Sequence, residues 1–306
     1  MTRPIRHGAL ALLLATPTMP GAIQTAAIAQ SQPQATTVPP APAPAPAPSW
    51  RRETAEELLG YIDGVVAEGL DAASYTPDRL RTAIASGNEA AITPVASQIF
   101  LKLAADLSGG SVRGRGRVDW HMADSGLDAA GQQRLLVQVT RGGAVGATLD
   151  SLLPTHPQYA GLKQALAATP PEDDTRRNLI RANMERWRWM PRNLGSRHVL
   201  VNVPAFTAAL IDNGQVVTRH RTVVGARRTP TPQLSATITA VTLNPWWTVP
   251  QSIIAENGGS FGPGYEVRRE GSYMIVRQPP GPRNALGRLK IEMPNEHAIY
   301  LHDTPS

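Results

Sequence analysis

The sequence predicts an α+β protein, in which an all-α N-terminal part precedes a mainly antiparallel, β-sandwich-like C-terminal part. From residue 51 to about 169, apolar residues recur at the spacing of helix faces. After residue 196, short runs rich in Val, Ile and Thr alternate with Gly and Pro turns, which is typical of strands. The 306 residues suffice for one or two domains. We therefore predict a helical domain over 51–169 and a second domain over 170–306.

The N-terminus has the features of an export signal. Arg3 and Arg6 precede a short apolar run, and Ala27-Ile28-Ala29 supplies small residues for cleavage. The apolar run is too short to span a bilayer. The pattern predicts a secretory signal peptide over 1–29 and a periplasmic location.

A Pro/Ala-rich linker is predicted over residues 30–50. Residues 38–48 alternate Pro and Ala, a composition that favours extended polyproline II and forms no packed core. We expect a semi-rigid tether here. We also expect no later stretch to be apolar enough for a transmembrane helix.

Helix boundaries follow from capping signals. Gly69 and the pair Gly109-Gly110 are predicted to end helices, and Thr76-Pro77 to begin one. Thr169-Pro170-Pro171-Glu172 has the form of a capping box that opens a helix running to about Pro191. The predicted helices between these signals cover 55–66, 95–107, 128–139, 144–153 and 159–167.

Strands are predicted from runs of β-branched residues between turns. Asp212-Asn213-Gly214 is a strong hairpin signal, because Asn-Gly tolerates the positive φ angles of a primed turn. The predicted strands cover 198–204, 205–211, 216–217, 222–225, 240–243, 273–276, 289–293 and 298–302.

Composition and charge limit the function classes. The formal charge is +6, which favours anionic partners, but no nucleic-acid-binding motif is visible. The Arg113–Arg117 cluster is interpreted as a solvated turn. The chain has no cysteine, which excludes disulfides and thiolate metal sites. A metal site formed by His297, His302 and Asp303 is disfavoured by its spacing on a strand, so we expect neither metal nor cofactor.

Trp187-Arg188-Trp189 permits two interpretations. The indoles could stack on sugar rings, or one indole could pack in the core beside a surface guanidinium. The second interpretation is preferred.

A series of short phrases, in order along residues 170–305, carries a resemblance. They include Val201-Asn202-Val203-Pro204, Thr229-Pro230-Thr231-Pro232, Asn244-Pro245-Trp246-Trp247-Thr248-Val249-Pro250, Asn284-Ala285-Leu286-Gly287 and His302-Asp303-Thr304-Pro305. Together they resemble the YkuD-type catalytic domain of L,D-transpeptidases. Residues 51–169 resemble the helical scaffold domain of large periplasmic members, through phrases such as His156-Pro157-Gln158-Tyr159.

The resemblance implies a reaction and its residues. The family transfers an acyl group from a peptidoglycan tetrapeptide stem to a meso-diaminopimelate amine, through a Cys thioester. His302 matches the family's proton-transfer histidine, and the backbone carbonyl of Asp303 could fix its tautomer. The resemblance further places Tyr300, Trp246, Trp247 and Asn284 along the acyl-donor cleft. Peptidoglycan stem peptides are the implied substrates, and cell-wall synthesis proteins of the periplasm are candidate partners.

The missing nucleophile leaves alternatives open. In the family a Ser-His-Gly-Cys signature follows the histidine shortly downstream, whereas this chain ends at Ser306. The leading expectation is a truncated L,D-transpeptidase that is inactive as given. The alternative is a non-catalytic periplasmic protein that binds cell wall or acts as a scaffold. A Ser-dependent acyltransferase is a third hypothesis, but a terminal serine is a poor nucleophile candidate.

Overall fold

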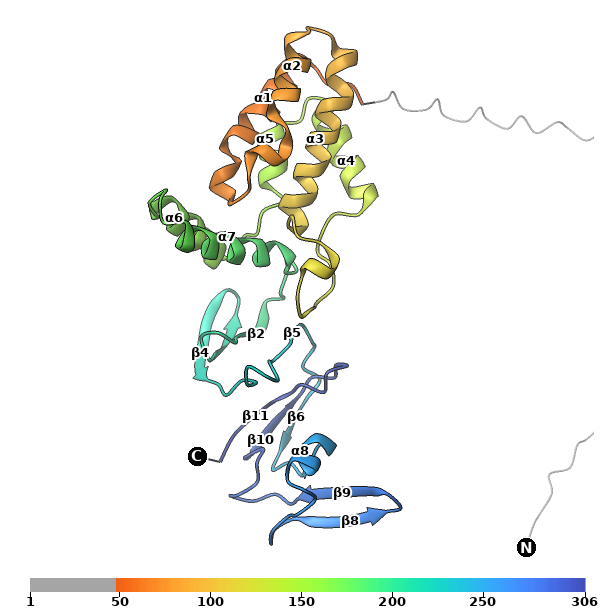
Figure 1. The fold of residues 1–306 in the computed structure, drawn as a ribbon, viewed down its shortest axis with the longest axis vertical. Helices are drawn as coiled ribbons and strands as arrows, with labels where there is room; N and C mark the ends of the chain where they lie inside the picture. The colour runs from red at the N-terminus through yellow and green to blue at the C-terminus, as the bar shows by residue number, and fades with distance from the viewer. Residues whose placement is uncertain (1–47, 306) are drawn as a thin grey trace, which may run out of the picture. The chain divides into compact units, whose positions relative to one another are not determined.

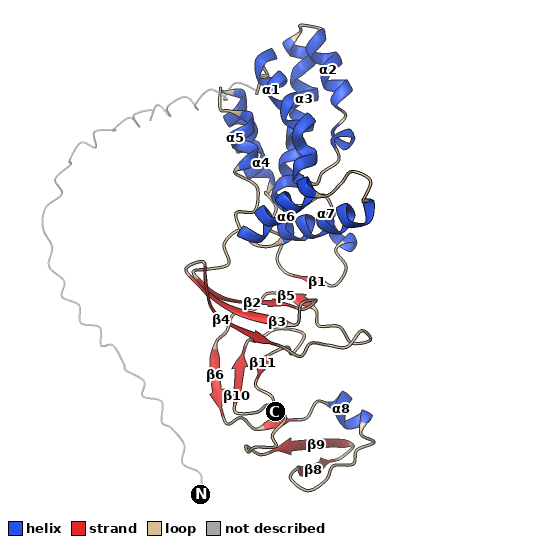
Figure 2. Cartoon of the chain, turned by 90° about the vertical axis from the view of Figure 1, so that its left-hand side faces the viewer, coloured by secondary structure: helices blue, strands red, loops and turns tan. Residues whose placement is uncertain are grey.

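The computed structural model describes residues 48–305 of the chain (Figure 1). Helices occupy the first part of this range and strands the second, which confirms the predicted α+β class (Figure 2). The predicted signal peptide, 1–29, and nearly all of the predicted linker, 30–50, lie outside the described residues.

The helical part follows the apolar periodicity closely. Its main core joins side chains from α1 to α5, with fully buried Leu58, Ile62, Phe100 and Leu149 among them. Gly69, at φ +73°, ends the first helical stretch as predicted. The elements are α1 (Arg52–Gly64), the 3-10 turns Val65–Glu68 and Ala72–Tyr75, α2 (Pro77–Ala85), α3 (Glu89–Gly109), the 3-10 turn Gly114–Gly116, α4 (Ala129–Thr140), α5 (Val145–Asp150), α6 (Pro157–Ala168) and α7 (Asp174–Trp189).

Helix α3 is the centre of this core. Ile92, Ala96, Leu103 and Leu107 are among its buried residues, and Gly110 caps its end as predicted. By length and composition α3 could also cross a membrane, contrary to our expectation that no such stretch follows the leader. In this structure its apolar side chains pack against α1, α2, α4 and α5.

Helix α7 packs on the helical part rather than on the strands that follow it. Ile180 and Met184 join Tyr159 and Leu166 of α6 in a second buried cluster. By packing, α7 therefore lies with the helices, while the predicted domain boundary at 169/170 stays a prediction.

The predicted capping box before α7 is wrong. The helix begins at Asp174, and the Asp173 carboxylate caps it by accepting from the Arg176 N–H at 3.0 Å. Thr169 instead closes α6, since its hydroxyl donates to the Ala165 carbonyl at 2.7 Å. The two prolines after Thr169 lie in the turn between the helices and do not enter α7.

The strands form three antiparallel sheets of three strands each and one parallel pair. The sheet orders are β2-β3-β4, β11-β10-β6 and β7-β9-β8, and β1 pairs with β5 in parallel. The bounds are β1 (Trp120–His121), β2 (Arg197–Asn202), β3 (Thr207–Asp212), β4 (Gln215–Arg221), β5 (Gln233–Leu234), β6 (Ala240–Leu243), β7 (Trp247–Thr248), β8 (Glu266–Glu270), β9 (Tyr273–Gln278), β10 (Leu289–Glu292) and β11 (Leu301–His302), with the short helix α8 (Gln251–Glu256) after β7.

The hairpin between β3 and β4 confirms the Asn-Gly prediction. Asn213 and Gly214 adopt φ values of 47° and 77°, the left-handed pair of a type I′ turn. Two other strand predictions need correction. Residues 222–225 form no strand, and the predicted strand 298–302 shortens to Leu301–His302 because Ala298 takes a positive φ of 52°.

Candidate active site around His302

His302 lies at the end of β11, on the edge of the β11-β10-β6 sheet. Its Cα partner across the ladder is Lys290 of β10, and its side chain is exposed. The ring Nδ1 is 2.5 Å from the carbonyl oxygen of Asp303. A carbonyl only accepts hydrogen bonds, so Nδ1 carries a proton, and in the neutral imidazole the lone pair then lies on Nε2. The imidazole is thus held in the tautomer that a general base needs.

The Asp303 side chain fixes the backbone that presents this carbonyl. Its two carboxylate oxygens accept from the Arg288 N–H at 3.1 Å and the Thr304 N–H at 2.9 Å. These backbone hydrogen bonds, the one from Arg288 first, lower the pKa of Asp303 below its ordinary value. The Asp303 N–H in turn donates to the Leu289 carbonyl at 2.9 Å.

Together, Gly287, Asp303 and His302 form what we call the His302 corner, and Gly287 is required there for two reasons. Its φ is +61°, and a Cβ added there would lie 2.6 Å from the Asp303 carboxylate oxygen Oδ2. The loop before β10 and the residue after His302 therefore fit together only with a glycine at this position.

Tyr300 lies beside the histidine. Its ring centroid is 5.7 Å from that of His302, and the rings are inclined by 52°. Lys290 Nζ is 4.4 Å from the Tyr300 ring centroid and 3.0 Å from Glu292 Oε2. Lys290 was not predicted as a site residue. The sequence feature that could have drawn attention to Lys290 is that it is one of only three lysines, whereas the chain's other basic residues are mainly arginines.

The two predicted tryptophans lie near a different sheet. Trp246 is 42% exposed, with the Arg277 guanidinium 4.8 Å from its ring centroid. Trp247, in β7, is half-buried and packs against the small cluster of Val249, Ile254 and Val276. Trp246 is therefore the more exposed of the two indoles.

Asn284 has a structural role in this geometry. Its side chain is 1% exposed, and Nδ2 lies within hydrogen-bond distance of the carbonyls of Pro245, Gln278 and Pro279 at 3.1, 3.2 and 2.9 Å. Its Oδ1 accepts from the Leu286 N–H at 2.8 Å. Its amide nitrogen and its oxygen both have partners, so in this structure Asn284 holds the loop against Pro245, and its contact with substrate stays a prediction.

The structure thus divides the predicted residues into two groups. His302, Asp303 and Tyr300 lie together, whereas Asn284 is tied to the segment that carries Trp246. Within residues 48–305, no hydrogen bond or ring contact joins His302 to Trp246, Trp247 or Asn284. Their shared lining of a cleft stays a prediction.

Other histidines and acids do not extend this site. His297 lies against His121 of β1, with ring centroids 4.1 Å apart. In the part of the chain that the structure describes, no three His, Asp or Glu side chains are placed to hold a metal ion.

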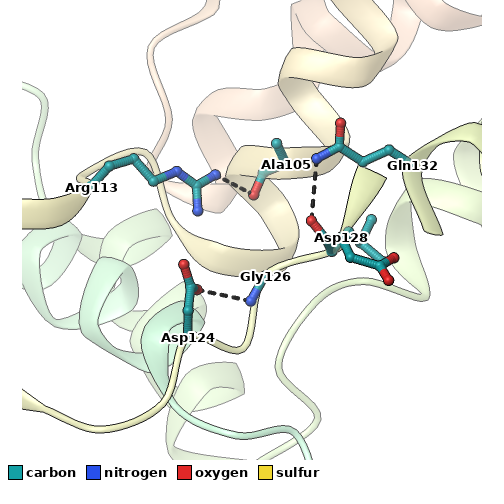
Figure 3. A pocket seen from close by; sticks show the side chains of 7 residues that line it. Ala105, Arg113, Asp124, Gly126, Asp128 and Gln132 are labelled. Atoms are coloured by element: carbon teal, nitrogen blue, oxygen red, sulfur yellow. Dashed lines mark hydrogen bonds between the residues drawn. The ribbon is translucent and has the colours of Figure 1, made fainter. Parts of the chain in front are cut away.

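A hollow in the helical part is separate from the predicted residues (Figure 3). The Arg113 guanidinium points into it and donates to the Ala105 carbonyl at 2.8 Å, while Asp124 accepts from the Gly126 N–H at 3.0 Å. The lining residues are Ala105, Arg113, Asp124, Gly126, Leu127, Asp128 and Gln132. The Arg113–Arg117 cluster is thus only partly a solvated turn, since the Arg117 side chain is 7% exposed.

The Trp187-Arg188-Trp189 segment corrects one detail of our interpretation. Trp189 is buried as expected, and Trp187 stacks on His156 with ring centroids 4.3 Å apart. Arg188, expected at the surface, is 1% exposed and forms an ion pair with Glu185 at 2.9 Å. It also donates to the Glu68 carbonyl and to the Tyr159 hydroxyl.

Comparison with known proteins agrees with the resemblance. Residues 196–306 match the L,D-transpeptidase catalytic domain, and residues 45–166 match a scaffold domain. The match to the L,D-transpeptidase catalytic domain thus concerns the C-terminal part of the chain. A Haemophilus influenzae protein named "Putative L,D-transpeptidase" is 28% identical over 134 residues. This match covers 35% of the chain and 27% of that relative's length.

The matched ranges help to decide which of the described features is the better candidate for an active site. The His302 corner falls inside the matched catalytic domain, whereas the hollow of Figure 3 falls inside the matched scaffold domain. Among the described features, the L,D-transpeptidase match therefore favours the His302 corner as the candidate active site.

Proposed function

We propose that this chain carries the histidine side of a peptidoglycan L,D-transpeptidase site and works in the periplasm. The reaction class is acyl transfer from a tetrapeptide stem to the side-chain amine of meso-diaminopimelate. One observation supports the proposal most: inside the matched catalytic domain, His302 has Nδ1 on the Asp303 carbonyl, and Nε2 has no hydrogen-bond partner among residues 48–305. Nε2 is then the atom that takes a proton from a nucleophile and returns it to the leaving amine.

The nucleophilic step needs an atom that these 306 residues do not supply. Transfer through a thioester requires a thiolate, and the sequence has no cysteine. We therefore expect the chain by itself to bind stem peptide and to form no acyl-enzyme.

The absence of cysteine from the sequence favours a second candidate function. A protein with the family's scaffold and sheet but without a thiol could bind cell wall or cell-wall synthesis proteins without catalysis. The two functions differ in what His302 does: the first places it against the bound stem peptide, and the second gives it no role.

Two measurements on the full-length chain test these functions. Intact-mass spectrometry after incubation with a carbapenem should show no covalent adduct. Titration with a tetrapeptide stem, followed by NMR, should perturb the His302 ring resonances, and His302→Gln should weaken binding whereas the exposed His220→Gln should not. A stable acyl adduct would contradict the expected inactivity. Stem-peptide binding that is indifferent to His302→Gln would favour the non-catalytic function.

A further inference from the structure

Strand β4 (Gln215–Arg221) is an open edge of the β2-β3-β4 sheet. Among the strands of residues 48–305 it pairs only with β3, and all seven of its residues are exposed. Val216 and Val217 are 51% and 56% exposed. An edge of this kind offers unpaired backbone groups to another chain.

The register shows which residues face that edge. The Thr222 N–H donates to the Phe206 carbonyl at 2.9 Å, on the β3 side. Backbone groups alternate in direction along an antiparallel strand, so those of His220 also point to β3. The N–H and C=O groups of Arg219 and Arg221 therefore point outward, where a further strand would pair.

Among residues 48–305, no acidic side chain forms an ion pair with Arg219 or Arg221, and the acid of their own sheet, Asp212, is paired with Arg197. Arg219 and Arg221 lie on one face, opposite Ala209 and Thr207 of β3. Residues 213–255 contain no Asp or Glu, and their cations are Arg219, Arg221, Arg227 and Arg228. Asp212, the acid that precedes this segment, is paired with Arg197 at 2.5 Å.

We propose that β4 binds an extended acidic segment of a partner polypeptide by strand addition. The segment would hydrogen-bond the outward backbone of Arg219 and Arg221 and place two carboxylates, one residue apart, on their face of the sheet. This spacing follows from the strand period of two, which puts alternate side chains on the same face.

Two other occupants fit the charges poorly. A second copy of β4 would set cationic strands against each other. The chain's own residues 1–47 contain no acidic residue. An acidic partner strand complements both the backbone and the charge of the edge.

Synthetic peptides test the proposal on the full-length chain by fluorescence anisotropy. A labelled peptide with Glu-Val-Glu among β-forming residues should bind, and the matched Gln-Val-Gln peptide should bind much more weakly. A peptide N-methylated at the Glu, Val and Glu amides should not bind, because it lacks the backbone donors that strand addition uses in either strand orientation.

Variants of the protein locate the binding surface. Arg219→Gln with Arg221→Gln should weaken binding by about tenfold, as expected from the loss of two exposed ion pairs. Arg268→Gln, an exposed arginine on β8, and His220→Gln, on the opposite face of β4, should leave binding unchanged.

Two results would overturn the proposal. Equal binding of the N-methylated peptide and of inorganic polyphosphate would show a non-specific polyanion surface. Absence of peptide binding, together with self-association of the Arg219→Gln/Arg221→Gln variant, would show that the arginines only protect the edge. Neither result bears on transpeptidation, because the test does not involve the His302 corner.

Discussion

Replacing Arg188 by methionine should destabilise the helical part strongly. The Arg188 guanidinium is 1% exposed and bonds Glu185 Oε2, the Glu68 carbonyl and the Tyr159 hydroxyl. Methionine fills a similar volume but leaves the buried Glu185 carboxylate without its cation. Glu185 keeps two partners, the Val112 N–H at 2.7 Å and the Trp189 indole N–H at 3.0 Å, so its charge is solvated only in part.

The expected loss is large compared with the stability of a domain. Removing one member of a buried ion pair costs about 3–5 kcal/mol, whereas domains are stable by about 5–15 kcal/mol. With a denaturant slope of about 1–3 kcal/mol/M in urea, the urea midpoint should fall by about 1–5 M. The assay is urea unfolding followed by helical circular dichroism. Arg186→Met is the matched control, because Arg186 lies on the same helix but is exposed.

A double-mutant cycle tests the physical reason. Glu185→Gln keeps an acceptor for Val112 and Trp189 but removes the charge. The Arg188→Met/Glu185→Gln variant should therefore be more stable than the sum of the single changes, by about 1 kcal/mol or more. If Arg188→Met shifts the midpoint no more than Arg186→Met, or if the two changes add, the buried pair does not stabilise the fold as argued.

Three further predictions follow from the described contacts. Gly287→Ala should displace Asp303 and change the His302 ring resonances in NMR, whereas Gly271→Ala, with φ +60° but open space around it, should cost only about 1 kcal/mol of backbone strain. Burial first, and the nearby His198 second, lower the pKa of His156 below its ordinary 6.5. Below pH 6.5 the unfolded chain therefore binds more protons than the folded one, and the free energy of unfolding should fall as the pH drops. If His156→Gln shows the same dependence of stability on pH as the unchanged chain, this prediction is contradicted. Limited proteolysis should spare a helical fragment and degrade the strands first, since their buried cluster is much smaller; equal resistance of both parts would contradict it.

Much of the helical part, and the β3–β4 hairpin, could be predicted because their sequence signals are local. Gly69 and Gly110 end helices where the sequence indicated, and the Asn213-Gly214 turn forms as expected. Each depends on one residue's backbone preference, which tertiary contacts did not override.

Predictions failed where a local pattern competed with another contact. Thr169 had two possible roles, and its hydroxyl bonds the helix behind it rather than the one ahead. Arg188 read as a surface cation because its partners Glu68 and Tyr159 are distant in sequence. The strands β7 and β8 were missed since β7 has two residues and β8 is wholly exposed, with no alternating apolar pattern.

The candidate site was predicted through family phrases rather than through residue chemistry. Those phrases placed His302 and the Asp303 carbonyl in contact, a contact that the structure contains. They gave no sign that Asn284 is buried and hydrogen-bonded within its own loop. Lys290, opposite His302, belongs to no such phrase.

The position of His302 depends on a loop more than on its sheet. Strand β11 has two residues, and it is the edge strand of its sheet. Stronger constraints come from the Asp303 carboxylate on the Arg288 N–H, from the Gly287 backbone that fits beneath it, and from Asn284, which anchors the same loop. A histidine whose tautomer is set by the backbone of its neighbour needs that neighbour held in place. The loop between β9 and β10 therefore orients the imidazole, and changes within it should affect His302 without touching the ring.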